Sequence, residues 1–187
     1  MGKPSVRDFG LLVLRAAMGS ILFVHGAQKL FGWFGGNGIA GTAVGFERIG
    51  FKPGQANAVA AGLGTAGGGA LLALGLATPA AGAAVAGTMA VAAEMHVPGG
   101  FFAHEGGVEY VAFLGVAATA VALTGPGELS VDSLLEHRLN RPWMRNIALA
   151  SVVPAAAVVV RRRRKALAAA TPAAPHLTAE PEVSADA

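Results

Sequence analysis

Three residues that can take part in ionic or acid–base chemistry interrupt the first apolar stretch of the sequence. They are Arg15, His25 and Lys29, within "LRAAMGSILFVHGAQKLFG". A cation in such a stretch costs free energy in a membrane unless neighbouring helices shield it. At 100° per residue Arg15 and Lys29 share one helix face, and His25 lies at the border of that face. We therefore expect this face to point towards protein.

More residues of this kind lie at the end of the third apolar run and at the start of the fourth. The segments "AAEMHVPGGFF" and "AHEGGVEYV" contribute Glu94, His96, His104, Glu105, Glu109 and Tyr110. Histidines, carboxylates, a lysine and a tyrosine that lie at the same depth in a membrane are suited to a proton relay, a metal site or hydrogen bonds to the head of a quinone. Neither H-x-x-x-H nor H-E-x-x-H occurs, so no spacing predicts a metal centre.

The composition predicts that membrane-spanning helices position these residues. The chain is 53% hydrophobic and 13% charged. No charge occurs from residue 53 to 93, about twice the roughly 20 residues of one span, and Pro79 divides this run. We predict an all-α integral membrane four-helix bundle with spans at about 9–29, 56–77, 80–95 and 109–125. A β-barrel is disfavoured because polar and apolar residues do not alternate. A soluble all-α protein is the structural alternative.

The region after the fourth span is basic and then low in complexity. The segment 147–160 is apolar but short, and Pro154 lies in its middle. We expect an interfacial helix there, with a fifth crossing as the alternative, because crossing would carry "RRRRK" outside. The predicted organisation is a transmembrane domain over 1–137, a basic juxtamembrane segment with a short apolar helix over 138–165, and a disordered tail over 166–187.

The distribution of basic residues predicts the topology. With four spans both termini share one side, which holds ten Lys and Arg against three on the other. The positive-inside rule then predicts a multi-pass inner-membrane protein with both termini cytoplasmic. We expect anionic lipids to bind the basic run of Arg161, Arg162, Arg163, Arg164 and Lys165. No nucleic-acid-binding motif accompanies this run. The chain has no cysteine, so any thiol chemistry belongs to another chain.

Several motifs in order resemble the DoxX family of small four-helix membrane proteins. They are "LRAAMGSILFVHGAQKLFG", "GGALLALGLATP", "HVPGGFF", "GGVEYV" and "TGPGELSVDSLL". The resemblance spans about residues 8–137. The resemblance implies a redox context. Relatives resemble the membrane subunit of a thiosulfate:quinone oxidoreductase, and others are linked with a superoxide dismutase and a sulfurtransferase in a membrane-bound assembly.

The resemblance also marks individual positions, which are Arg15, His25, Gly26, Lys29, His96, Glu109 and Tyr110. One position departs from the pattern. Family members often carry a glutamate in the second helix before the "GG", and the matching residue here is Thr65. If that carboxylate usually pairs with the Arg15 or His25 position, this chain satisfies those groups in another way.

These observations lead to one main hypothesis and two alternatives. The main one is a membrane component of an oxidoreductase or oxidative-stress-defence assembly with a quinone as cofactor. If the protein is catalytic, His25, Glu94 and Glu109 handle protons. Lys29, His96 and Tyr110 then hold the quinone head. Arg15 has a structural role towards a carboxylate, either Asp8 or Glu94. The alternatives are a non-catalytic anchor for soluble redox enzymes and, disfavoured by the lack of a continuous polar path, a small-solute transporter.

Overall fold

Local signals at both ends fix the first helix, α1 (Val6–Phe31). The computed structural model describes residues 3–170. Ser5 and Asp8 form a capping box, in which the Asp8 carboxylate accepts from the Ser5 backbone N–H at 2.8 Å. The helix ends at Gly32, whose φ of 71° is readily adopted by glycine. Its 26 residues rise about 39 Å, enough to cross a bilayer.

The uncharged run folds into two antiparallel arms. The descending arm consists of α3 (Gly54–Gly62), a π-helical turn η2 (Leu63–Gly67) and α4 (Gly68–Leu74). The ascending arm is α5 (Thr78–His96), and Pro79 lies in its first turn. The chain reverses at Gly75, where φ is 64°. Because proline lacks a backbone donor, the first helical turn is the place where it costs least.

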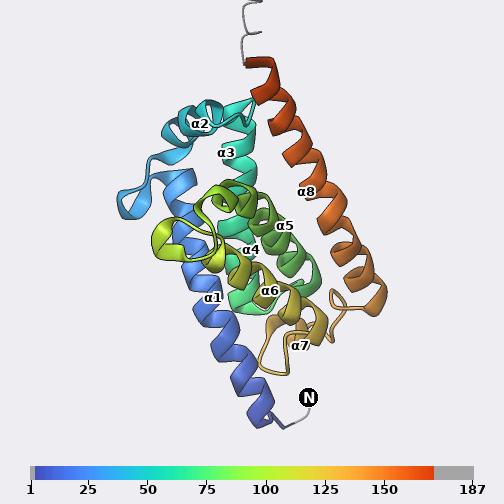
Figure 1. The fold of residues 1–187 in the computed structure, drawn as a ribbon. Coiled ribbons are helices and arrows are strands. Elements are labelled where there is room, and N and C mark those ends of the chain that lie inside the picture. The colour runs from blue at the N-terminus through green and yellow to red at the C-terminus, as the bar shows by residue number, and fades with distance from the viewer. Residues whose placement is uncertain (1–2, 171–187) are drawn as a thin grey trace, which may run out of the picture.

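Shorter elements complete the described chain. They are η1 (Trp33–Gly35), α2 (Gly38–Arg48), η3 (Val97–Gly99), η4 (Ala103–Glu105), α6 (Glu109–Thr124) and α7 (Val131–Leu134), followed by the long α8 (Pro142–Ala170). Within the bundle α5 packs on α6 and α8, and α1 packs on α4 (Figure 1). The core includes Leu22, Leu72, Val85 and Val121, all almost inaccessible to solvent.

The structure confirms an all-α fold with four helices long and apolar enough to cross a membrane. Residues 3–170 contain no strand. The four helices are Val6–Phe31, Gly54–Leu74, Thr78–Gly99 and Pro142–Ala170. This set differs from the predicted one, because α6 over the predicted fourth span has 16 residues and falls in the shorter class. The fourth long helix is α8.

The predicted short helix at 147–160 is much longer in the structure. The helix α8 has 29 residues, includes Pro154, and runs on through the arginine run to Ala170. Arginine and alanine favour helices, which explains why the charged segment continues the helix rather than ending it. The predicted tail 166–187 is helical over 166–170, and its remainder lies outside the described residues.

The long α8 changes how the ends of the chain are arranged. It starts near the end of the bundle where α1 begins and runs to the end where α1 finishes (Figure 1). In chain order, the segments that run along the bundle are α1, α3 to α4, α5, α6 and α8. The first and last described residues lie at opposite ends of the bundle, whereas the four-span prediction placed them on one side.

Candidate cavity for an amphiphilic ligand

A cavity of about 900 Å³ lies between the helices α1, α2, α3, α5, α6 and α8. The turn η2 adds Thr65 to its lining, and the α2–α3 connection adds Ile49 and Phe51. Among the described residues, no Asp or Glu lines it. Most lining residues are apolar, and the remaining ones are His25, Lys29, Asn57, Thr65, Thr88, His96, Tyr110 and Ser151. A large apolar pocket with a few polar groups is typical of a small-molecule site.

The charged and aromatic polar groups of the lining come from helix ends on one side of the bundle. His25 and Lys29 lie in the last two turns of α1, His96 ends α5, and Tyr110 is in the first turn of α6. The helices α1 and α5 finish towards the side of the bundle where α6 begins (Figure 1). The rings of His25 and Tyr110 meet edge to face with centroids 6.1 Å apart.

Hydrogen bonds leave donors available at this polar end. The Lys29 ammonium donates to the His25 carbonyl at 3.0 Å, which uses one of its three protons. One ring nitrogen of His96, Nδ1, is 2.8 Å from the Gly106 carbonyl, leaving Nε2 for another partner. The Tyr110 hydroxyl has no hydrogen-bond partner within residues 3–170. A neutral head with carbonyl acceptors fits this donor set.

The hydroxyl groups of the threonines and the serine in the lining already have acceptors within their own helices. Thr65 donates to the Ala61 carbonyl, and Thr88 donates to the Ala84 carbonyl at 2.8 Å. Ser151 donates to the Ala148 carbonyl at 2.7 Å. Most of the remaining wall is apolar and forms a channel. Thr65, which replaces the glutamate expected from the family resemblance, adds no charge to it.

The channel is long enough for an extended tail. On α5 the lining runs from Ala80 to His96, a rise of about 24 Å. On α8 it runs from Ala148 to Val159, a rise of about 16 Å. A polar end joined to an apolar channel of this length matches an amphiphile with one compact head and one long tail.

The structure brings four of the predicted site residues together and leaves the two glutamates apart from them. His25, Lys29, His96 and Tyr110 all line the cavity. Glu94 instead pairs with α8, where Arg164 donates to both of its carboxylate oxygens at 2.9 and 3.0 Å. The catalytic role of Glu94 stays a prediction, and its contacts favour a structural one.

The polar residues of the α5–α6 loop make their contacts within that loop or face solvent. Glu109 accepts from the Ala103 N–H at 3.0 Å. His104 and Glu105 face solvent, with 3.8 Å between the His104 Nε2 and Glu105 Oε1 atoms. Residues 3–170 hold no group of three or more His, Cys, Asp and Glu arranged to bind a metal. The role predicted for Glu109 in proton handling stays a prediction.

Arg15 is fully buried and bonds to main-chain carbonyls. Its guanidinium donates to Leu129 at 2.7 Å and to Leu72 at 3.5 Å. The carboxylate that interacts with it electrostatically is Asp132, not Asp8 or Glu94 as expected. Asp132 also caps α5, accepting from the Thr78 N–H at 3.0 Å and the Thr78 hydroxyl at 2.8 Å. Arg15 thus has a structural role that joins α1, the α4–α5 turn and the α6–α8 connection.

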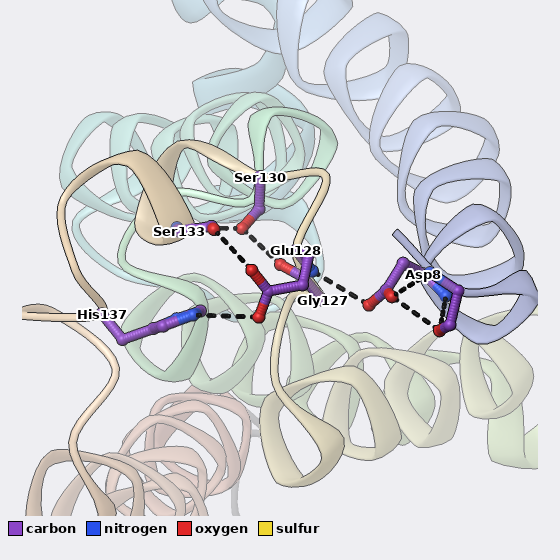
Figure 2. Close-up of polar contacts among 7 residues, drawn as sticks. Asp8, Gly127, Glu128, Ser130, Ser133 and His137 are labelled. Atoms are coloured by element: carbon purple, nitrogen blue, oxygen red, sulfur yellow. Dashed lines mark hydrogen bonds and ion pairs between the residues drawn. The ribbon is translucent and has the colours of Figure 1, made fainter. Parts of the chain in front are cut away.

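Asp8 takes part in a second polar cluster, which joins the first turn of α1 to the segment after α6 (Figure 2). Its carboxylate accepts from the Glu128 N–H at 2.9 Å. Glu128 in turn accepts from the Ser133 hydroxyl at 3.2 Å and lies 3.9 Å from His137. These contacts hold residues 127–137 against the first turn of α1, so Asp8 anchors the segment that carries Asp132.

Several lining residues were missed from the sequence. Phe46 and Phe51 of the α2–α3 region pack with ring centroids 5.5 Å apart and cover the cavity. The α8 residues were missed because 147–160 was expected to lie at the interface. A helical repeat of small and branched residues at 148, 152, 156 and 159 was the available signal.

Comparison with known proteins defines the family. The family model for DoxX matches residues 10–105, about half of the chain, so the protein belongs to the DoxX family. No curated protein and no solved structure matches it significantly. The match includes α1 through α5 and ends before α6 and α8. Fold and family together define a multi-pass membrane protein.

Proposed function

We propose that this DoxX protein binds a quinone in the cavity and acts as the membrane component of an oxidoreductase or oxidative-stress-defence assembly. The observation that carries the proposal is that His25, Lys29, His96 and Tyr110 all line one long, mostly apolar cavity, with the His25 and Tyr110 rings in contact. A bound quinone supplies the redox chemistry, and the chain supplies binding, orientation and protons.

The polar residues take distinct parts in this function. Lys29 and Tyr110 donate hydrogen bonds to the carbonyl oxygens of the head. We assign proton transfer at the head to His25 and His96, because the described lining residues include no carboxylate. Electrons come from a further bound cofactor or from a partner, since the chain has no cysteine for dithiol chemistry.

Binding of a quinone with a ten-carbon tail tests this function. The purified protein in lipid nanodiscs is titrated beside two variants, His25→Phe, which keeps ring volume, and Tyr110→Phe, which removes only the hydroxyl. Each lost hydrogen bond should weaken binding about three- to tenfold. His104→Phe is the matched control, because His104 is 76% exposed and lies outside the cavity. Equal affinity in all four proteins contradicts the proposal.

The proposed function includes soluble partner enzymes. A superoxide dismutase and a sulfurtransferase are the partners that the resemblance implies. The anchor alternative relies on the basic run, yet Arg163 and Arg164 are engaged within the chain, which leaves Arg161, Arg162 and Lys165 exposed for anionic lipids. A pull-down with the full chain and with a variant in which Arg161, Arg162 and Lys165 are replaced by Gln separates the two functions. Loss of redox enzymes with this variant alone favours the anchor.

The proposed location is the inner membrane, with a revised topology. The end of the bundle where α8 finishes carries eight Lys and Arg, and the end where α1 begins carries five, Arg15 being internal. The positive-inside rule then favours a cytoplasmic location for the end of α8 and for the polar end of the cavity. The N-terminus lies on the other side, contrary to the expectation from four spans.

A further inference from the structure

One wall of the cavity comes from outside the residues that match the family model. The helix α8 contributes Ala148, Ser151, Val152, Ala155, Ala156 and Val159. Steps of three or four residues place these side chains on one helix face. The family match ends at residue 105. The wall facing the tail channel is therefore a feature of this chain beyond the matched core.

Contacts at both ends fix this helix against the bundle. At its start Arg145 donates to the Leu123 carbonyl of α6 at 3.2 Å. Near its end Arg164 pairs with Glu94, and Arg163 donates to the Ile49 carbonyl at 2.9 Å. The Arg163 guanidinium also lies 5.5 Å from the centre of the Phe51 ring. The cavity therefore has a defined wall on this side.

Small side chains on both walls keep the channel open. The alanines of α8 share the cavity with Ala80, Ala83, Ala84 and Gly87 of α5. Each additional methylene on a lining residue reduces the volume that is left for the ligand. Among the described α8 residues in this wall, the one polar side chain, Ser151, donates to the Ala148 carbonyl, so α8 offers the ligand apolar contacts.

We propose that α8 makes the site selective for ligands with a long apolar tail, and that Ala156 is a residue that sets this selectivity. The inference rests on the proposed quinone site and assigns its tail-binding half. Burying a tail gains about 0.8 kcal/mol for each methylene removed from water, so a free channel converts tail length into affinity. A blocked channel loses that gain and leaves contacts to the head unchanged.

The test compares three probes on three proteins in nanodiscs. The probes are a benzoquinone with one isoprene unit, the same ring with a long isoprenoid tail, and a polyprenol of equal tail length without the ring. The proteins are the wild type, Ala156→Phe and Ala150→Phe. Ala150 is exposed on another face of α8 and does not line the cavity, so it is the matched control.

We expect Ala156→Phe to weaken binding of both long-tailed probes at least tenfold and to change binding of the short quinone less than twofold. Ala150→Phe should match the wild type. Equal weakening of short and long probes, or no change with either, overturns the role of α8. If the wild type binds the polyprenol as tightly as the long quinone, the quinone function fails. The α8 proposal is then decided by the polyprenol and the two variants.

Discussion

Arg15 shows what a single buried residue does in this bundle. Its guanidinium is inaccessible to solvent and reaches the Leu129 and Leu72 carbonyls, which belong to segments far away in sequence. A buried cation is tolerated only where carbonyl dipoles or carboxylates compensate it. Asp132 provides the nearby negative charge. Arg15 therefore orders the connection between α6 and α8.

Replacing this residue should destabilise the whole domain. Arg15→Met leaves the Asp132 charge uncompensated and the Leu129 carbonyl without its donor, which should cost about 3 kcal/mol or more. We expect a clearly lower thermal unfolding midpoint in detergent. Arg7→Met is the control, because Arg7 is exposed on the same helix. An unchanged midpoint for Arg15→Met contradicts the structural role.

Residue types predicted part of the site, and long-range contacts determined the rest. His25, Lys29, His96 and Tyr110 were identified from polarity within apolar segments. The partners of Arg15 were not, because Asp132 lies in a segment whose position depends on tertiary contacts. Glu94 looked catalytic because carboxylates in apolar helices are rare. Its partner, Arg164, is 70 residues away and was assigned to a separate segment.

At the scale of elements, close helix packing depends on glycines, which have no side chain. Gly26 of α1 faces the backbone of Ala66 in η2, and a Cβ at Gly26 would overlap it. In a membrane, such contacts between small residues are a main source of helix association. This approach also positions His25 and Lys29 next to the cavity.

A methyl group at this contact should loosen the bundle. Gly26→Ala is expected to lower the unfolding midpoint and to weaken quinone binding, since α1 must move away from η2. Gly10→Ala tests the same change at a position of α1 with nothing within 4 Å. Thermal unfolding of both variants in one detergent gives the comparison. Equal midpoints for both would mean that the close approach does not contribute to stability.

The contact between α5 and α8 is also open to a direct test. Glu94→Gln removes the charge that Arg163 and Arg164 share, and with it the ion pairs that join α8 to α5 near the end of α8. Amide exchange over residues 155–170 should then become faster. The control, Glu136→Gln, breaks the exposed pair with Arg138 and should leave α8 unchanged. Unchanged exchange in Glu94→Gln would show that this ion pair does not hold α8 against α5.

Helix lengths explain where element prediction succeeded and where it did not. The break at Pro79 was predictable because proline acts locally. The length of α8 was not, because Pro154 and four consecutive arginines both resemble helix ends. The α8 arginines are instead supported by Glu94, Ile49 and Phe51, which only the fold brings to them.

At the scale of the whole molecule, the number of passes decides the topology. Because the chain lacks cysteine, single cysteines at Ser5 and Ala170 report on the two ends without background. We expect an impermeant maleimide to label them from opposite sides of the membrane, with Ala170→Cys reacting in inverted vesicles. Labelling of both from one side would show that α8 does not cross. The all-α membrane class followed from hydropathy alone, whereas the number of passes depended on α8.

The central claim is that the cavity is a quinone site, and photolabelling tests it most directly. A long-tailed quinone with an azide on the ring is activated on the protein in nanodiscs, and the labelled peptides are identified by mass spectrometry. The account predicts labels at the end of α1 and the start of α6, near His25 and Tyr110, suppressed by excess unlabelled quinone. Labels spread over exposed apolar positions such as Val13 and Val116, and insensitive to competitor, would contradict it.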